Sequence, residues 1–318
     1  MIDLTTYYPD NNKKIIFRIL DIGSCGGIGD RLLGLCSSFI LSLILNFEFR
    51  IYWTYPINID KILDENIIKW NKNDYNINEI NNDLGLIDND MIINRHILYN
   101  NIYEYFNKSM TIISNKAFYL YLFKNTYIKN RLLELNIINQ NDIIHNCMNI
   151  LFKFKYQTRI KYNILLYNFS KYYTIGLQVR SFIGEFYDKL DINKLIPYYN
   201  FIEDNYKIHN NLQVYLCSDS ANIITHFINK YKHIKFIITA NDIIHLELSK
   251  DNNMNIDNNL KLILEIYTLG KTQQLLITYN SNFGRISALI NKKIPYINNG
   301  DNYILSNFES ILSKDIIN

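Results

Sequence analysis

The stretch Thr174-Ile-Gly-Leu-Gln-Val-Arg-Ser-Phe182 guides the interpretation of the whole chain. Residues 172–179 are mostly apolar and are bounded by turn formers, which predicts a short buried strand. The strand ends on one cation, Arg180, whose planar guanidinium can bind a phosphate or a carboxylate through two parallel hydrogen bonds. Arg180 is therefore either an anion-binding residue at a strand end or a capped surface arginine, and other segments must decide between these.

The second half of the chain alternates predicted strands and helices. Strands are expected at 173–179, 213–217, 235–239, 274–278 and 294–297, and helices at 198–206, 221–231, 260–270 and 286–290. Arg180, Asp219 and the turn Ser281-Asn-Phe-Gly284 each follow a predicted strand. Because the carboxyl ends of parallel strands converge on one crevice, these three loops are expected to form one ligand site.

A glycine-rich turn organises the first half. Residues 14–22 predict a strand, and Gly23-Ser-Cys-Gly-Gly-Ile-Gly29 follows it directly. Apolar residues then recur at helical spacing from Arg31, and residues 48–53 predict a second strand. This order is the start of a parallel doubly wound sheet. The glycines do not have the register of a dinucleotide fingerprint, and we reject that interpretation.

Two charged residues, Asp30 and Arg31, stand at the mouth of this first helix. We expect their side chains to face the crevice, and the alternative is a helix-capping aspartate beside a solvated arginine. Further along, residues 99–123 and 128–154 are predicted to be helices that pack on the first sheet, and 162–172 are predicted to be a linker. The expected domains are therefore residues 1–170 and 171–318.

Composition excludes several classes of protein. The 318 residues are 48% hydrophobic, enough for two domains with their own cores. A net charge of +3 with 20% charged residues provides no basic stripe for nucleic acid. The four cysteines have no metal-ligand pairing and are expected to be reduced. The N-terminus does not resemble a leader, and the apolar run 35–47 is too short to span a bilayer, so we expect a cytoplasmic protein without a transmembrane segment.

A cation, an acid and a small polar turn entering a helix suit a nucleoside diphosphate. Arg180 and the helix amides can take the phosphates, while Asp219 can accept hydrogen bonds from a base or ribose. Spacing alone does not distinguish a nucleotide sugar from other nucleotides.

Three segments resemble the fucosyltransferase superfamily of GT-B fold glycosyltransferases, most closely its plant xyloglucan branch, glycosyltransferase family 37. Gly26-Gly-Ile-Gly-Asp-Arg31 is similar to the glycine-rich loop of that family, usually written GGLGNR. Ile175-Gly-Leu-Gln-Val-Arg-Ser-Phe182 resembles its donor-phosphate motif, with Gln178 where other branches have His. The segment from Leu262 to Gly284 resembles the helix-strand segment that ends in Ser-x-Phe-Gly.

The resemblance implies an α/β fold of the GT-B type, in which two Rossmann-like domains with parallel sheets face a central cleft. The first domain would be on the acceptor side, and the second would bind the nucleotide sugar. By this resemblance Arg180 binds the β-phosphate of GDP, and Asp219 lies near the guanine or ribose. The residues expected to hold the donor are Gly27, Gly29, Arg31, Gln178, Arg180, Ser218, Asp219, Ser281, Asn282, Phe283 and Gly284.

The implied activity is an inverting transfer of L-fucose, or of a related 6-deoxyhexose, from a GDP-sugar to a glycan. No metal motif of the Asp-x-Asp kind is expected on a loop after a strand, so we expect neither a metal nor a cofactor. Arg180 and the helix amides are then expected to stabilise the departing diphosphate. A second hypothesis is a non-catalytic nucleotide- or glycan-binding module derived from such a transferase. The alternation of strands and helices disfavours a third, a structural helical protein.

An inverting transfer needs a carboxylate to take the proton of the acceptor hydroxyl. Glu185 is one candidate, with Asp188 as its neighbour, since it lies on the loop leaving the strand of Arg180. Asp30 is the other and is ranked first, because it replaces the usual Asn of the family with an ionisable group at a position where some protein O-fucosyltransferases place Asn or Glu near the reacting centre. Capping by Asp30 and solvation of Glu185 remain the alternatives.

Overall fold

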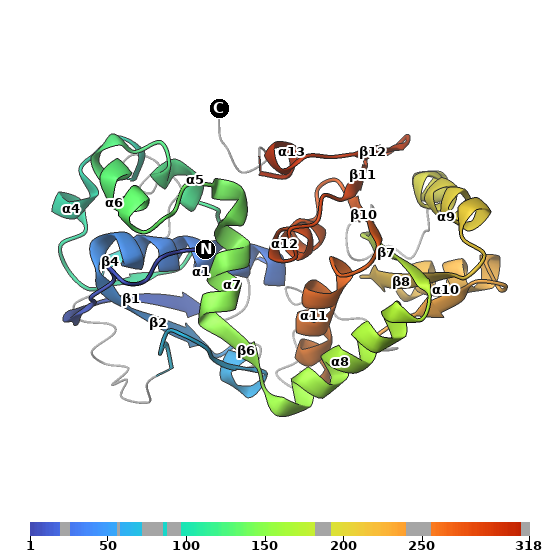
Figure 1. The fold of residues 1–318 in the computed structure, drawn as a ribbon, viewed down its shortest axis with the longest axis horizontal. Coiled ribbons are helices and arrows are strands. Elements are labelled where there is room, and N and C mark those ends of the chain that lie inside the picture. Colours follow the sequence, from blue (N-terminus) through green and yellow to red (C-terminus); the bar gives the residue numbers. More distant parts are fainter. Residues whose placement is uncertain are drawn as a thin grey trace. The chain divides into compact units, whose positions relative to one another are not determined.

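The structure is a computed structural model that describes residues 1–19, 26–55, 58–71, 85–87, 97–181, 192–239 and 256–312. The chain divides into two compact units, one formed by Met1–Lys155 with Leu312–Asn318 and the other by Tyr156–Ile311. Each unit contains its own parallel or mostly parallel sheet, which confirms the predicted α/β class. Figure 1 labels helices and strands of both units.

The first unit is built on a four-stranded sheet in the order β2-β1-β5-β4. All its strand pairs are parallel. The strands are β1 (Asp10–Ile19), β2 (Phe47–Trp53), β5 (Met110–Ile112) and β4 (Gly85–Ile87). The predicted strands at 14–22 and 48–53 correspond to β1 and β2, which lie side by side with Phe17 opposite Ile51.

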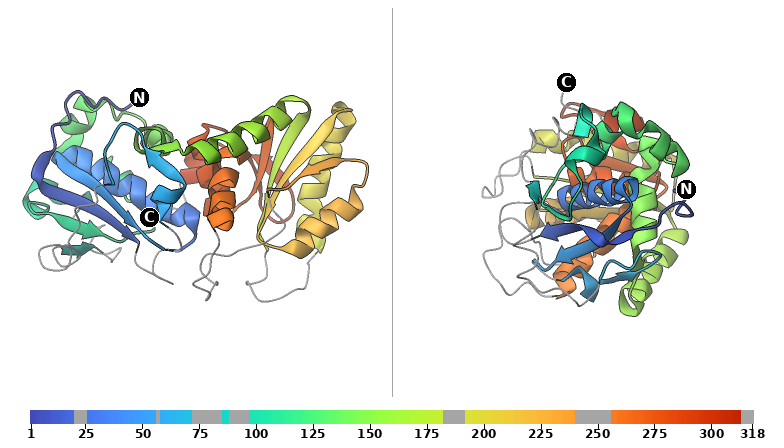
Figure 2. Two further views of the ribbon diagram at one scale, coloured as in Figure 1. Left: turned by 90° about the horizontal axis from the view of Figure 1, so that it is seen from below. Right: turned by 90° about the vertical axis from the view of Figure 1, so that its left-hand side faces the viewer.

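Helix α1 (Ile28–Leu45) lies on one face of this sheet (Figure 2). Every residue of α1 except Asp30 is buried, as expected for a helix that is apolar on all sides. Gly34 allows the close packing, because a Cβ there would come within 1.8 Å of the carbonyl oxygen of Ser114. The buried hydroxyls of Ser37 and Ser38 donate to carbonyls of the preceding turn at 2.8 Å, which satisfies them inside the helix.

Among the described residues, α1 is the one helix long and apolar enough to cross a membrane by length and composition. The apolar run 35–47 was expected to be too short to span a bilayer, but the helix begins at Ile28 and so includes residues before that run. Since 94% of its residues are buried inside the structure, α1 is the central helix of its unit.

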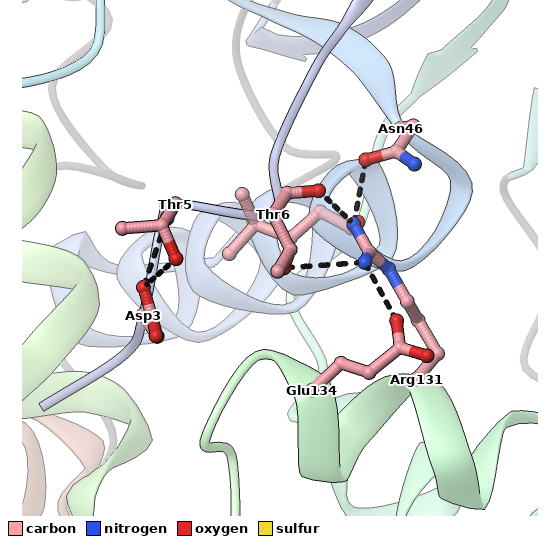
Figure 3. Close-up of polar contacts among 7 residues, drawn as sticks. Asp3, Thr5, Thr6, Asn46, Arg131 and Glu134 are labelled. Carbon is pink, nitrogen blue, oxygen red and sulfur yellow. Dashed lines mark hydrogen bonds and ion pairs between the residues drawn. The ribbon is translucent and has the colours of Figure 1, made fainter.

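Arg131 connects three segments of the first unit (Figure 3). From helix α6 (Lys129–Glu134) its guanidinium donates to the carbonyl oxygen of Thr6 at 3.0 Å, to that of Leu43 at 3.2 Å and to Asn46 Oδ1 at 2.6 Å. Asn46 is the left-handed C-cap of α1, with φ of 56°. Arg131 thus satisfies the exposed carbonyl end of α1 and places a cation at the negative end of the helix dipole.

Arg131→Ala is expected to lower the free energy of unfolding of the first unit by about 2–4 kcal/mol, because several partly buried hydrogen bonds are lost together. Urea denaturation followed by tryptophan fluorescence measures this unit selectively, since the two tryptophans of the chain, Trp53 and Trp70, are both buried in it. The control is Lys129→Ala on the exposed side of the same helix. Equal stability of the two variants would contradict the assigned role.

The rest of the first unit differs from the prediction. Residues 99–123 and 128–154 were expected to be helical, yet they include strands β5 and β6 (Phe152–Phe154). Strand β6 pairs antiparallel with β3 (Leu63–Glu65). These strands have three residues each, too few for a period-2 pattern to be visible. The helices between them are α4 (Ile102–Tyr105), α5 (Tyr119–Leu122), α6 and α7 (Ile143–Leu151), with 3₁₀ turns at Ile59–Lys61, Thr126–Ile128 and Gln140–Asp142.

The second unit contains a six-stranded sheet in the order β12-β11-β10-β7-β8-β9. Its strands are β7 (Tyr173–Val179), β8 (Leu212–Ser218), β9 (Lys235–Ile237), β10 (Gln274–Thr278), β11 (Tyr296–Asn298) and β12 (Tyr303–Leu305). The first five are parallel and correspond to the five predicted strands. The antiparallel edge strand β12 was not predicted.

Helices cover both faces of this sheet (Figure 1). On one face α9 (Ile196–Ile208) and α10 (Ala221–Lys230) pack against Ile175, Leu177 and Val179 of β7. On the other, α8 (Tyr156–Ser170), α11 (Ile256–Leu269) and α12 (Asn282–Ile290) pack against the alternate residues of β8 and β10. Burial on both faces explains why these strands are continuous apolar runs. Two short helices, Ile192–Leu195 (3₁₀) and α13 (Phe308–Leu312), complete the elements.

The predicted linker at 162–172 is wrong, because α8 occupies Tyr156–Ser170. Phe169 is buried in the core of the second unit, and Leu165 and Leu166 pack against the same cluster. The helix therefore belongs to the second unit, and the division falls after Lys155 instead of after residue 170.

Candidate anion-binding site

The topology of the second sheet identifies one end of β7 as the place for a ligand. From β7 the chain continues to β8 and β9 on one side, and it then returns to add β10 and β11 on the other side. The order of the strands therefore reverses between β7 and β10, and ligands of open α/β sheets bind at such a reversal, outside the carboxyl ends. Arg180 follows β7, Asp219 follows β8, and the turn before α12 follows β10.

Buried hydrogen bonds hold the end of β7 to the end of β10. The backbone N–H of Arg180 donates to Thr278 Oγ1 at 3.0 Å. Tyr198 OH lies 2.7 Å from Thr278 Oγ1 and 3.2 Å from the carbonyl oxygen of Gln178. The backbone N–H of Thr278 donates to Gln178 Oε1 at 3.1 Å. Thr278 thus sets the backbone position from which the guanidinium of Arg180 extends.

Thr278→Val is expected to weaken GDP binding about tenfold, because valine keeps the β-branched shape but removes the acceptor for the Arg180 N–H. Thr278→Ser retains the hydroxyl and is expected to bind GDP like the unchanged protein. Isothermal titration with GDP measures both, and circular dichroism confirms folding. If valine binds as well as serine, the hydroxyl does not position Arg180.

Asp219 holds the loop that leaves β7. Its Oδ1 accepts a hydrogen bond of 2.7 Å from the backbone N–H of Ser181, and its Oδ2 lies 3.8 Å from Arg180 Nε. The Arg180 side chain is 41% exposed, whereas that of Asp219 is 16% exposed. The arginine therefore presents donors to solvent while the acid orients it. The predicted contact of Asp219 with a base or ribose remains a prediction.

Ser218, also predicted to hold the donor, has a local role in the structure. Its Oγ accepts a 3.2 Å bond from the backbone N–H of Ser220. Ser220 in turn is the N-cap of α10 and accepts from Ile223 N. These bonds organise the turn after β8.

Ser281 is the N-cap of α12 and has an unusual side chain. It is 2% exposed, and its hydroxyl makes no cap bond to the helix. Its buried Oγ has no hydrogen-bond partner among the described residues. A buried hydroxyl without a partner costs free energy. The first-turn N–H groups of α12 point outward at the same place and carry the positive end of the helix dipole.

The approach of α12 to the sheet depends on Gly284. A Cβ at this position would lie 2.8 Å from the Cβ of Ile277 and 3.0 Å from Gln178 Oε1. Gln178 is itself buried, and its Oε1 is occupied by Thr278. Gln178 therefore acts here as a spacer beneath the helix N-terminus, and its predicted contact with the donor remains a prediction.

The remaining residues of the turn are partly exposed. Asn282 and Phe283 are both half-buried, and Phe283 packs against the core of the second unit. Arg285 is 3% exposed and donates to Asn282 Oδ1 and, through Nε at 2.7 Å, to the carbonyl oxygen of Ile311. This buried arginine fixes the helix start, and Arg180 is the cation of the site that reaches solvent.

The glycine-rich loop of the first unit is capped by Asp30. Gly27 is the N-cap of α1, and its N–H donates to Asp30 Oδ2 at 3.1 Å. Gly26 has a φ of 64°, a left-handed conformation, and a Cβ there would lie 2.8 Å from Asp30 Oδ2. Gly29 is buried within the first turn. Gly27, and not Asp30, is thus the N-cap, and Asp30 caps the helix from within its first turn by accepting from the Gly27 N–H. The proposed role of Asp30 as a base is a separate question.

Arg31 does not face a crevice, which corrects the prediction. It is 1% exposed and donates to the carbonyl oxygens of Gly26 at 3.0 Å and Tyr55 at 2.8 Å. Its guanidinium also lies 5.8 Å from the ring centres of Trp53 and Tyr55. The helical position of Arg31 turns its side chain toward the end of β2, where it holds the glycine-rich loop.

The structure thus brings together Arg180, Asp219 and the Ser281 turn within one unit. Glu185 and Asp188 lie outside the described residues. Asp30, Gly27 and Gly29 belong to the other unit.

Sequence reasoning missed Glu265 on α11. It is 5% exposed, accepts a hydrogen bond from Thr239 Oγ1 just after β9, and lies 3.9 Å from Lys261 Nζ. Burial raises the pKa of Glu265 to about 7. Buried carboxylates with perturbed pKa values concentrate at functional sites. The signal was present in the sequence as one acid inside the apolar run Leu262-Ile-Leu-Glu-Ile-Tyr267.

Metal binding needs one correction. Within the described part of the chain, no group of three His, Cys, Asp or Glu side chains could hold a metal ion. However, strand β4, which was not predicted, ends at Ile87 directly before Asp88-Asn-Asp90. An Asp-x-Asp motif therefore does follow a strand, although residues 88–90 lie outside the described ranges.

No family model and no curated protein sequence matches the chain. Solved structures do match. A variant of FUT1 from Arabidopsis thaliana in complex with GDP superposes with a TM-score of 0.63 at 16% identity, over 92% of this chain and 72% of that one. The fucosyltransferase NodZ from Bradyrhizobium gives 0.58 at 15% identity, over 94% and 99%. POFUT1 in complex with GDP gives 0.50 at 9% identity, over 91% and 99%.

The chain shares the fold of GT-B fucosyltransferases. The similarity extends over nine-tenths of the chain in each comparison, so it includes both units. This confirms the fold class that the sequence motifs implied. At 9–16% identity the similarity concerns the fold and leaves activity to be argued from the residues.

Proposed function

We propose that the protein is an inverting, metal-independent glycosyltransferase that moves L-fucose or a related 6-deoxyhexose from a GDP-sugar to a glycan. In this proposal the second unit binds the donor and the first unit binds the acceptor. Arg180 takes the β-phosphate, and the amides of the α12 N-terminus with the hydroxyl of Ser281 take further phosphate oxygens. The developing negative charge of the leaving GDP is stabilised by these donors.

The observation that carries the proposal is the unpartnered hydroxyl of Ser281. It is buried at the N-terminus of α12, beside a strand reversal that also presents the exposed guanidinium of Arg180. A diphosphate supplies the acceptors that both groups require. Proteins that share the fold support the choice of GDP, since FUT1 and POFUT1 were solved with GDP and NodZ was soaked with GDP-fucose.

Finer parts of the proposal rest on the motifs. Placement in the plant xyloglucan branch rests on Gln178 within the donor-phosphate motif and on the Ser-x-Phe-Gly turn. Because Glu265 is buried near the end of β9, we include it as a candidate acceptor for N–H groups of the base. A cytoplasmic location is also part of the proposal.

A non-catalytic binding module is the competing function. An enzyme and a binding module would both bind GDP, so a measurement of GDP binding does not distinguish the two functions. The decisive experiment incubates the protein with a panel of GDP-sugars over a glycan array and measures released GDP together with sugar transferred to glycan. Transfer from GDP-fucose supports the enzyme. GDP binding without transfer to any glycan supports the module, and absence of GDP binding contradicts both.

Activity is expected to survive EDTA, because the proposed stabilisation of the diphosphate comes from Arg180 and helix amides. GDP release from GDP-fucose is measured with EDTA and again after Mg²⁺ or Mn²⁺ is restored. Strict dependence on a divalent ion would contradict the metal-independent mechanism and would direct attention to Asp88 and Asp90. Loss of the metal-supported activity in the folded double variant Asp88→Asn, Asp90→Asn would then identify the ligands.

A further inference from the structure

Helix α8 is apolar on two opposite sides. At about 100° per residue, Thr158, Leu165 and Phe169 point in one direction, toward the core of the second unit. Four further apolar residues, Tyr156, Ile160, Ile164 and Tyr167, fall within an arc of about 80° on the opposite side. A helix that packs on a core normally has a polar outer face, so the second apolar side requires an explanation.

This second side is exposed. The exposed fractions are 66% for Tyr156, 37% for Ile160, 55% for Ile164 and 63% for Tyr167. The four residues form a continuous stripe of about 16 Å along the helix, since each residue adds about 1.5 Å. Single exposed apolar residues are ordinary, but a continuous stripe marks an interaction surface.

Cations border the stripe. Arg159 and Lys161 are exposed on its two flanks, and Lys171 Nζ lies 4.0 Å from the ring centre of Tyr167. Lys153 and Lys155 precede the helix in sequence but belong to the first unit, where Lys155 Nζ lies 3.5 Å from Asp64 Oδ1. No Asp or Glu occurs between Asp142 and Glu185, although the chain as a whole contains 30 acids and 33 bases. The segment that contains this helix therefore has a local excess of positive charge.

We infer that the exposed face of α8, formed by Tyr156, Ile160, Ile164 and Tyr167 with the flanking Arg159 and Lys161, binds an anionic lipid surface. A helix that lies in the plane of a membrane surface has apolar and aromatic residues directed into the interface and basic residues beside them. Tyrosines at both ends of the stripe suit the headgroup region, where amphipathic rings are enriched. The basic flanks attract acidic headgroups.

A second copy of the chain fits this face less well. In a two-fold dimer the same patch meets itself, which places Arg159 and Lys161 close to their own copies. With no acid on the helix, that contact is repulsive. A lipid surface without net charge likewise lacks the negative surface potential that would attract Arg159 and Lys161. The combination of apolar stripe and cations therefore selects an anionic surface, and this inference does not depend on the proposed transferase activity.

The test is sedimentation of the full chain with vesicles. Vesicles of phosphatidylcholine with phosphatidylserine are expected to bind the protein, and binding is expected to fall as salt is raised. Vesicles of phosphatidylcholine alone are expected to bind at least about tenfold less. Ile164→Asp is expected to reduce binding to the anionic vesicles about tenfold or more, because it places within the stripe a negative charge that the anionic headgroups repel.

Matched controls separate this face from the rest of the surface. Ile208→Asp makes the same change at a 74% exposed isoleucine on α9 and is expected to bind as the unchanged protein does. Arg159→Glu is expected to weaken binding, whereas Lys232→Glu, at another exposed cation, is expected to leave it nearly unchanged. Circular dichroism and size-exclusion chromatography confirm that each variant is folded.

Three results would overturn the inference. The protein fails to bind anionic vesicles, or Ile164→Asp and Ile208→Asp bind equally well. In the third, the protein is a dimer in solution that Ile164→Asp converts to a monomer while no vesicle binding is found. That outcome assigns the face to a second copy of the chain.

Discussion

Arg180→Ala is expected to abolish sugar transfer and to weaken GDP binding by about 2–4 kcal/mol, the loss that accompanies removal of a charge-assisted contact at a partly buried site. The structure gives the reason for so large an effect. Arg285, the other arginine near the α12 N-terminus, is buried and committed to Ile311, so it is not available to replace Arg180. Isothermal titration with GDP and the transfer assay measure the two effects.

Two further variants define what Arg180 contributes. Arg180→Lys is expected to recover only part of the affinity, because an ammonium cannot provide the parallel pair of hydrogen bonds. Lys194→Ala removes another cation of the same unit and serves as the control for a change in net charge. If Arg180→Ala binds GDP normally, phosphate recognition is wrongly assigned to the end of β7.

The second unit could be predicted from sequence because its strands are buried on both faces. Strands β7 and β10 were predicted with the bounds that the structure gives, since each is an apolar run stopped by polar turn formers. Helix α8 was not predicted, because its sequence lacks a clear pattern. Its two apolar sides remove the one-sided pattern by which a surface helix is recognised, and no glycine or proline separates it from β7.

The strands of the first unit were predicted less well, because they pair with strands that are distant in sequence. Strand β5 has three residues and pairs with β1, with Ile15 opposite Met110. No local pattern indicates such a pairing, and aromatic residues around β5 favoured helices. The missed strand β4 had a further consequence, because the Asp88-Asn-Asp90 motif was not recognised as following a strand.

Within the candidate site, sequence indicated residue types at strand ends but not the direction of their side chains. Arg180 follows strand β7, and Arg31 follows the glycine-rich loop. The side chain of Arg180 is exposed, whereas that of Arg31 is buried and donates to the carbonyl oxygen of Tyr55. Direction depends on tertiary packing, in this case on Trp53 and Tyr55 around Arg31. The unpartnered hydroxyl of Ser281 is likewise visible only in three dimensions.

Asp30→Asn is expected to lower kcat by roughly 10²–10⁴, if Asp30 is the base that takes the acceptor proton, with little change in GDP affinity. The structure makes this a clean substitution. Asp30 Oδ2 caps α1 by accepting from Gly27 N, and the amide oxygen of asparagine can accept the same bond. Asparagine is also the usual residue of the resembling family at this position, so the loop is expected to keep its shape.

The outcome is informative because capping and proton transfer respond differently. Asp30→Ala removes both the cap and the base, and it is expected to destabilise the first unit by about 1 kcal/mol as well as to slow transfer. Asp30→Asn removes the base alone, so tryptophan fluorescence during urea denaturation should show stability close to that of the unchanged protein. A near-normal kcat in Asp30→Asn, with Asp30→Ala reduced only in stability, would show that the residue is a cap. The role of base would then pass to Glu185, and Glu185→Gln in the same assay is expected to show the fall in kcat that Asp30→Asn did not.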